Sequence, residues 1–221
     1  MNKKKAVLFG LSGFSEVVDF YLTHDSEYEV VAFTASDEAI DAPLFLGRPV
    51  IPWSKIESSY SPEDTELFIS VGYVKLNEIR QKFVAEAKEK GYRLLSYVCS
   101  KATTWPNLNI GENVFIFEDN TIQPFVKIGD NNIFWSGNHI GHHTEIGCNN
   151  FFSSHVVVSG YCKIGNNSFF GVNSTLADSL TIGDRNLIGP GAMLQKSTAD
   201  DEVYFGARAD MYDGKSSRFF K

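Results

Sequence analysis

An apolar residue recurs at every sixth position through the second half of the chain, and no other feature constrains the fold as strongly. Fifteen successive positions, from Ile110 to Leu194, carry an apolar residue without an insertion. A period of eighteen lies on top of it, because Ile-Gly recurs at every third repeat: Ile110, Ile128, Ile146, Ile164 and Ile182. Such self-similarity indicates a repeat architecture in which each unit stacks on the next.

Eighteen residues made of three sixes describe one turn of chain with three similar sides. Each side is a short strand with one apolar side chain pointing inward, and turns stack at roughly 4.8 Å. Asn and Gly suit the corners because they tolerate left-handed backbone angles, as at Asn113, Asn131, Asn149 and Asn167. The period therefore predicts a parallel β-solenoid over residues 110–199, with a partial turn from Val98. The hexapeptide signature resembles that of left-handed parallel β-helices, and the handedness rests on that resemblance. A different β-solenoid is the alternative.

The first half has the pattern of a small parallel α/β domain. Apolar runs predict strands at 6–9, 30–33, 67–71 and 94–98, and helical spacing predicts helices at 14–22 and 76–87. We therefore expect a Rossmann-like domain over residues 1–97, a left-handed β-helix over 98–199 and a C-terminal tail over 200–221.

Composition narrows the partners and the compartment. The formal charge is −7, from 20 Lys and Arg against 27 Asp and Glu, so nucleic acid is a poor default partner. No apolar run approaches the roughly 18 residues of a membrane span. Three cysteines do not make a disulfide framework. We expect a protein without a membrane span in the cytoplasm.

A turn in the N-terminal half is a candidate anion site. The segment Gly10-Leu-Ser-Gly13 follows a strand and opens a helix, so its backbone N–H groups could hold a phosphate. It lacks the G-x-G-x-x-G pattern of dinucleotide sites, and a plain tight turn is the alternative. Asp37, after the second strand, could accept from a ribose or base, or could be a solvated acid.

Four of the five histidines lie within seventeen residues: His139, His142, His143 and His155. His142 and His143 follow the inward Ile140 by two and three positions, which places them at an outward corner. Residues eighteen apart stack, so His142 shares a column with Pro124, Gly160, Asp178 and Lys196. Histidine carries protons near neutral pH, and Lys196 would lie three turns away, roughly 14 Å.

With these residues placed, the chain resembles the bacterial sugar acyltransferases with hexapeptide repeats, such as sialic acid O-acetyltransferases and UDP-4-amino-sugar N-acetyltransferases. The resemblance covers Ser12-Gly13, Leu46-Gly-Arg-Pro-Val50, Val71-Gly72 followed by Arg80, and the coils. It implies that acetyl-CoA binds to the β-helix between subunits of a homotrimer. It also implies that the N-terminal domain holds a nucleotide-linked amino sugar through Gly10, Ser12, Gly13, Phe14, Asp37 and Gly72.

The resemblance also assigns roles in the coils. The motif H-x-x-x-I-G runs from His142 to Gly147, so His142 inherits the general base. Gly160 would contact the thioester end of CoA, and the segment ending at Lys196 would line the CoA arm. Phe151 replaces a second family histidine near the acyl thioester. His143 stands where some members carry an acid and joins His142 as a catalytic candidate. Glu145 and Asn138 are further candidates for orienting the base.

The predicted function is transfer of an acetyl group from acetyl-CoA to an amine, or a hydroxyl, of a nucleotide-linked sugar. The mechanism would be direct attack, in lipopolysaccharide or other glycan biosynthesis, with acetyl-CoA as co-substrate and no metal. Two alternatives remain open. Some left-handed β-helices resemble carbonic anhydrases, whose histidines bind zinc at a subunit interface. A non-catalytic assembly protein is the other.

Overall fold

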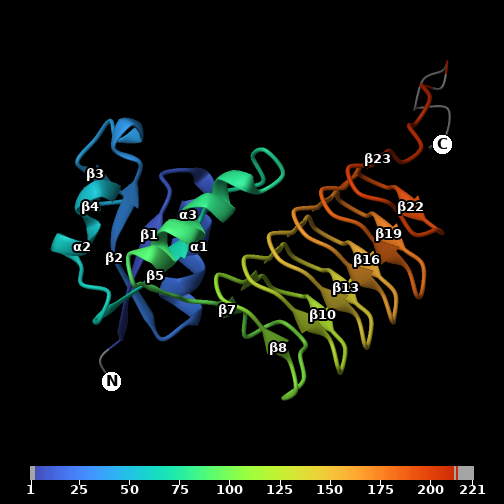
Figure 1. Ribbon diagram of the computed structural model, residues 1–221, viewed down its shortest axis with the longest axis horizontal. Helices are drawn as coiled ribbons and strands as arrows, with labels where there is room; N and C mark the ends of the chain where they lie inside the picture. The colour runs from blue at the N-terminus through green and yellow to red at the C-terminus, as the bar shows by residue number, and fades with distance from the viewer. Residues whose placement is uncertain (1–2, 212, 214–221) are drawn as a thin grey trace, which may run out of the picture.

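The computed structural model describes residues 3–211 and 213 and shows two domains side by side (Figure 1). The N-terminal domain is a six-stranded sheet in the order β3-β4-β2-β1-β5-β6. Its strands are β1 (Lys4–Phe9), β2 (Tyr28–Ala35), β3 (Leu44–Phe45), β4 (Arg48–Pro52), β5 (Thr65–Ile69) and β6 (Arg93–Leu94). All neighbours pair in parallel except β3 and β4.

Helices cover both faces of this sheet, which explains why its strands are apolar on both sides. Helix α1 (Gly13–Asp25) packs on one face, where Val18 and Leu22 meet Leu8. Helices α2 (Ile56–Ser59) and α3 (Glu78–Glu89) pack on the other face. Two 3₁₀ turns, Asp37–Ala39 and Trp53–Lys55, complete the domain.

The β3–β4 hairpin is an element that hydrophobic periodicity does not predict. Its strands are short, and the turn at Leu46 and Gly47 has φ angles of 49° and 74°, the left-handed pair that a two-residue hairpin requires. Arg48 then reaches α1, where its Nη1 lies 2.6 Å from a carboxylate oxygen of Asp19. The hairpin is thereby tied to the helix that follows the first strand.

The C-terminal domain is a parallel β-helix built from two-residue strands in three sheets. We call the first sheet the covered face: β7 (Tyr97–Val98), β9 (Phe115–Ile116), β12 (Ile133–Phe134), β15 (Phe151–Phe152), β18 (Phe169–Phe170), β21 (Leu187–Ile188) and β23 (Val203–Tyr204). The neutral face is β10 (Thr121–Ile122), β13 (His139–Ile140), β16 (Val157–Val158), β19 (Thr175–Leu176) and β22 (Met193–Leu194). The charged face is β8 (Asn109–Ile110), β11 (Lys127–Ile128), β14 (Glu145–Ile146), β17 (Lys163–Ile164) and β20 (Thr181–Ile182).

The predicted period is confirmed residue by residue. Strands pair with those eighteen residues away, and the rings of Phe134, Phe152 and Phe170 stack inside at centroid distances of 4.5 and 4.4 Å. The partial first turn is present as well, because Val98 pairs with Ile116.

Two boundaries differ from the sequence analysis. The strand expected at 94–98 is divided into β6, which ends the α/β sheet, and β7, which begins the β-helix. At the other end the solenoid continues past residue 199, because Ile188 pairs with Tyr204. This last coil spans sixteen residues instead of eighteen, so strict periodicity cannot find it. Of the expected tail, residues 212 and 214–221 lie outside the described residues.

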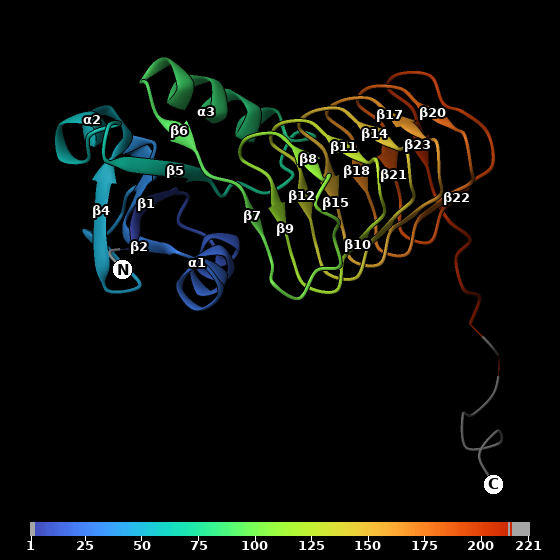
Figure 2. The same ribbon diagram turned by 90° about the horizontal axis from the view of Figure 1, so that it is seen from below.

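Figure 2 shows α1 and α3 beside the first coils of the solenoid, where the two domains share a junction on the covered face. The outward side chains of Phe115, Ile133 and Phe151 are buried against the side of the sheet that carries α1. These three outward apolar residues of the solenoid are therefore part of the N-terminal core. None of the helices in the described part of the chain is long and apolar enough to cross a membrane.

Arg80, on α3, fixes the same junction with a fully buried charge. Its guanidinium donates to both the side-chain and the main-chain oxygen of Asn131, at 2.8 and 3.1 Å, and to the main-chain oxygen of Asn150. It also donates to the carbonyls of Val71 and Gly72, at 3.1 and 3.2 Å. Burial lowers the pKa of Arg80 to about 9, so the group stays charged at neutral pH. Arg80 thus joins the loop after β5 to the asparagine corner of the solenoid.

Candidate active site

A cleft of about 410 Å³ opens at the carboxyl ends of β1, β2 and β5, the edge where α/β sheets hold their ligands. Three residues of the sequence-predicted sugar site line it: Gly10, Ser12 and Gly72. Gly10 has a φ of 134°, and a Cβ there would come within 2.6 Å of the Ser15 hydroxyl. Only glycine fits this turn without strain.

The other three residues predicted for the sugar site do not line this cleft. The Gly13 Cα faces open space. Phe14 packs toward the solenoid, 5.9 Å from the Trp135 ring centroid. The Asp37 carboxylate accepts from the Ser54 hydroxyl and N–H, at 2.5 and 3.1 Å, and these hydrogen bonds lower its pKa. Asp37 therefore links its own 3₁₀ turn to the second one, Trp53–Lys55, through Ser54. Its neighbours Ser36 and Ala39 line the cleft.

His142 lies at the corner between the neutral and charged faces, which we call the histidine edge. Its ring rests on Gly160 of the next coil, so that a Cβ on Gly160 would meet the ring atoms at 2.9–3.2 Å. The backbone is held on the other side, where the His142 N–H donates to Gln123 Oε1 at 2.9 Å. The column computed from the period is confirmed for this pair, and the absent side chain at Gly160 is what makes room for the ring.

His143 stands in a second column on the same edge. Its ring lies between Phe125 and Tyr161, one coil to either side, at centroid distances of 4.7 and 4.9 Å. Its Nδ1 lies 3.2 Å from Nδ1 of His142. The sequence analysis did not single out Phe125 or Tyr161, although both lie on the eighteen-residue lattice with His143.

The remaining clustered histidines are not part of this group. His155 lies at the edge between the covered and neutral faces, with its ring against Gly137. His139 points outward from β13 on the neutral face. Among residues 3–211 and 213, no three His, Cys, Asp or Glu side chains gather closely enough to hold a metal ion.

The residues predicted to bind acyl-CoA are divided between two places. Lys196 is exposed in the last coil, next to a hollow of about 350 Å³. Phe151 is buried on the covered face, with its ring 5.0 Å from that of Tyr73. It lines a shallow groove of about 240 Å³ between the two domains, together with Tyr73, Trp135, Ser153, Ser154 and Val172. Within the chain, Phe151 is thus separated from His142 and Gly160, which lie at the opposite corner of the solenoid.

The same separation applies to the two main parts of the candidate site. The N-terminal domain lies beside the first coils and packs against outward residues of the covered face (Figure 2). In a triangular prism the edge opposite that face is the histidine edge. Within the chain, His142 therefore lies away from the side of the solenoid that packs against the N-terminal domain.

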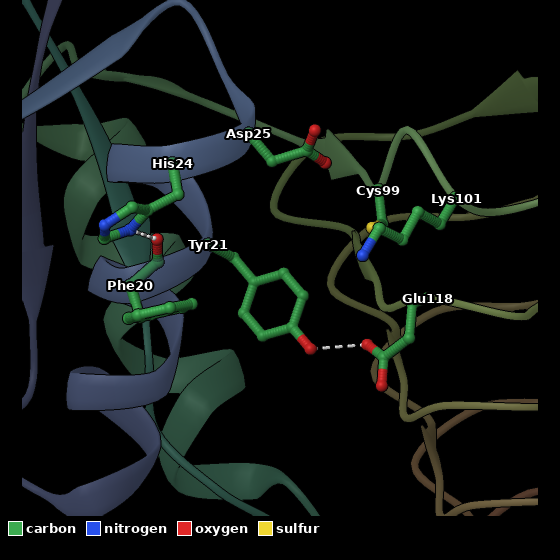
Figure 3. Close-up of a pocket in the computed structure, with 7 residues that line it drawn as sticks. All are labelled: Phe20, Tyr21, His24, Asp25, Cys99, Lys101 and Glu118. Atoms are coloured by element: carbon green, nitrogen blue, oxygen red, sulfur yellow. Dashed lines mark hydrogen bonds between the residues drawn. The ribbon is translucent and has the colours of Figure 1, made fainter.

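A further pocket of about 360 Å³ lies between α1 and the first coils (Figure 3). Tyr21 reaches across it and donates to Glu118 at 2.5 Å. Asp25 accepts from the Ser100 N–H at 2.8 Å and from the Tyr97 hydroxyl. Both acids are occupied by contacts that join the two domains, so we assign this pocket to the junction.

Comparison with known proteins supports this architecture. Residues 107–142 match the family profile of the bacterial transferase hexapeptide, with six repeats, and no curated protein matches the sequence. The solved structure of PerB from Caulobacter crescentus, in complex with CoA and GDP-perosamine, is similar with a TM-score of 0.80 and 24% identity over 91% of this chain and 94% of that chain. This enzyme, a perosamine N-acetyltransferase, has also been solved with one histidine replaced by asparagine or alanine.

Two further structures show the same likeness. The acetyltransferase domain of PglB from Neisseria gonorrhoeae, in complex with acetyl coenzyme A, has a TM-score of 0.82 and 22% identity over 92% of this chain and 97% of that chain. WeeI from Acinetobacter baumannii has a TM-score of 0.75 and 21% identity over 90% and 94%. The predicted fold class, a Rossmann-like α/β domain followed by a left-handed parallel β-helix, is thereby confirmed. The chain carries the hexapeptide repeat of bacterial transferases and shares the two-domain fold of PerB and the PglB acetyltransferase domain.

Proposed function

We propose that the protein transfers an acetyl group from acetyl-CoA to an amine, or a hydroxyl, of a nucleotide-linked sugar. One observation carries the proposal: the His142 ring packs on Gly160, and neither His142 Nε2 nor the Gly160 N–H forms a hydrogen bond with a described residue. A free base beside a free donor is what acyl transfer needs. The ligands of the similar structures, CoA with GDP-perosamine and acetyl coenzyme A, support the two substrate classes.

In this mechanism the uncharged sugar amine attacks the thioester carbonyl carbon while His142 Nε2 takes the proton from nitrogen. The Gly160 N–H donates to the carbonyl oxygen as negative charge develops there, a contribution that is usually large. The C–S bond then breaks and CoA leaves. Holding both substrates in place supplies much of the remaining rate enhancement. The single-histidine variants of the perosamine N-acetyltransferase support a histidine as the base.

The sugar nucleotide belongs in the cleft at Gly10, Ser12 and Gly72, and CoA belongs along the histidine edge toward Lys196. Because His142 lies away from the side of the solenoid that contacts the N-terminal domain, His142 of one copy would serve the cleft of another. The neutral face supports packing between copies, since its outward residues carry no Asp, Glu, Lys or Arg, and Val157 and Met193 are exposed. We propose the homotrimer that this arrangement requires.

We favour an amine acceptor, because the perosamine enzyme among the similar structures is an N-acetyltransferase. Such a reaction modifies a sugar before it enters a glycan or lipopolysaccharide. The cysteines Cys99, Cys148 and Cys162 are free thiols. This suits a reducing compartment and supports the cytoplasm as the place of the reaction.

The direct test is release of the CoA thiol from acetyl-CoA in the presence of nucleotide-linked amino sugars. His142→Ala should lower kcat at least about 100-fold, as expected for loss of a general base, with unchanged affinity for CoA. His24→Ala is the matched control, because His24 is exposed at the end of α1 and should retain full activity. Equal loss in both variants, or no turnover of any sugar nucleotide, would contradict the proposal. Activity that a chelator abolishes would favour the zinc alternative.

Mixed trimers test the sharing of the site between subunits. We expect trimers of His142→Ala alone and of the cleft variant Ser12→Trp alone to be inactive. Co-expression of the two should restore activity, because one subunit can supply an intact cleft and its neighbour an intact His142. Light scattering should show a trimer at micromolar concentration. A monomer, or mixed assemblies as inactive as their parents, would refute the shared site.

A further inference from the structure

Three aromatic rings form a ladder on the outside of the histidine edge. Phe125, His143 and Tyr161 occupy the same corner position of successive coils, with φ angles of 67°, 59° and 57°. The His143 ring is tilted by 34° to Phe125 and by 16° to Tyr161. Because an aromatic ring lies on each side of it, the His143 ring is confined to one orientation. In this orientation its Nδ1 faces Nδ1 of His142.

The His142 ring stands almost perpendicular to this ladder. Its plane makes angles of 86° with His143 and 85° with Tyr161, at centroid distances of 5.3 and 5.0 Å. The Nδ1 atoms of the two histidines are 3.2 Å apart. A hydrogen bond between two imidazole nitrogens needs one donor and one acceptor, so the pair fixes the tautomers of both rings together. When His142 Nδ1 donates, its Nε2 must carry a lone pair.

The other candidates for orienting His142 are occupied elsewhere. Glu145 accepts from Lys127 at 2.8 Å on the charged face, and this contact lowers its pKa. Asn138 is buried, where its amide donates to the Trp135 carbonyl and its oxygen accepts from the Val156 N–H. Asp178, in the His142 column, accepts from the Ser179 hydroxyl at 2.6 Å. Among the described residues, only His143 hydrogen-bonds to the His142 ring.

We propose that His143 is the positioning residue of the reaction: its Nδ1 accepts from Nδ1–H of His142 and leaves His142 Nε2 as the basic nitrogen. This inference rests on the proposed function. When Nε2 takes the substrate proton, His142 becomes the cation, and His143 stabilises this cation by accepting from its Nδ1–H. The departing CoA thiolate then takes this proton from Nε2, so atoms and charge balance and His142 returns to its starting tautomer. A neutral ring thus does what a carboxylate does in the usual triad.

Two substitutions at position 143 test separately the role of Nδ1 as a hydrogen-bond acceptor and the role of the ring in stacking. His143→Asn places an acceptor oxygen at the same number of bonds from the backbone as Nδ1, and Asn tolerates the left-handed φ. His143→Phe keeps the stack between Phe125 and Tyr161 but removes the acceptor, and Phe125 shows that phenylalanine fits this corner. We expect His143→Phe to lower kcat about 10- to 100-fold, by analogy with lost partners of functional histidines, with KM unchanged for both substrates. His143→Asn should stay within a few-fold of the natural chain.

A readout independent of turnover completes the test. Nitrogen-15 NMR of the histidine rings reports which nitrogen carries the proton. We expect the Nδ1–H tautomer of His142 in the natural chain and in His143→Asn, and loss of this preference in His143→Phe. The Nε2–H tautomer in the natural chain, or an active Phe variant beside an inactive Asn variant, would overturn the inference. Absence of any acetyl transfer with the expected tautomers would instead count against the proposed function alone.

Discussion

Replacing Gly160 with alanine tests how closely the base must be placed. The added Cβ would meet ring atoms of His142 at 2.9–3.2 Å and no backbone atom among its three nearest contacts. Since ordinary contacts are about 3.5–4.0 Å, the ring must move by about 0.5 Å or more. A displacement of about 1 Å can cost about 100-fold in rate, so we expect kcat to fall about 10- to 100-fold at saturating acetyl-CoA. The Gly160 N–H remains, which isolates the effect of the displaced ring.

Stability should change little in this variant, because the clash falls on a side chain that can rotate. Alanine also has less conformational freedom than glycine in the unfolded chain, which raises the free energy of unfolding by about 0.4–1 kcal/mol and offsets part of the clash. Gly141→Ala is the comparison: there a Cβ would lie 2.5 Å from backbone atoms of Ser159 and Gly160. It should destabilise by about 1–3 kcal/mol or more. Urea midpoints and thiol release measure both effects. A Gly160→Ala enzyme with full kcat and unchanged stability would refute the assigned place of the base.

Three further predictions concern the N-terminal domain and its junction. Arg80→Lys keeps the charge, but a lysine ammonium cannot bind all the oxygens that the guanidinium binds. The hydrogen bonds to the Val71 and Gly72 carbonyls should be lost, and the loop that carries them should become more mobile. The KM for the sugar nucleotide should rise several-fold while that for acetyl-CoA stays constant, and equal rises in both would contradict this. Gly10→Ala should lower the melting temperature and weaken sugar-nucleotide binding, as calorimetry would show, because its Cβ would meet Ser15 and the Ser70 carbonyl. Asp25 has a lowered pKa because it accepts from Ser100 and Tyr97. Its stabilising effect is therefore present above the ordinary value of 3.8 and lost as the pH falls through the lower folded value. Asp25→Asn should destabilise at pH 7, and the difference from the natural chain should shrink below about pH 4 in urea titrations; a constant difference would be the contrary result.

The solenoid could be predicted from the sequence because its period is a direct image of its geometry. One inward side chain per strand and one strand per six residues leave no freedom in register, so the contact between His142 and Gly160 follows by counting. The last coil escaped this reasoning because it is two residues shorter. The β3–β4 hairpin was not predicted because β3 has only two residues and the five residues of β4, Arg48–Pro52, show no alternation of polar and apolar side chains.

Placement of residues between domains could not be read from the period. The resemblance implies ligand contacts for Phe151 and Phe14, and these contacts stay predictions; in the structure both residues belong to the cluster that joins α1 to the covered face. A buried aromatic and a ligand-contacting aromatic have the same appearance in a sequence. The role of Arg80 was likewise hidden, because its partners are main-chain oxygens and asparagine amides, which no charge pattern reveals. The ladder of Phe125, His143 and Tyr161 was within reach, since its members are eighteen residues apart.

The stacking of coils also has a consequence for how the chain folds. Each coil contacts only its neighbours, so the order of assembly is set by whichever end is best anchored. That end is the first coil, where β7 continues from the α/β sheet and the outward residues Phe115 and Ile133 are fully buried. Toward the last coil the equivalent positions become exposed, as at Val203. We therefore expect the coils beside the N-terminal domain to be the most stable part of the solenoid. Amide exchange should be slowest beside this domain and quicken coil by coil toward β23.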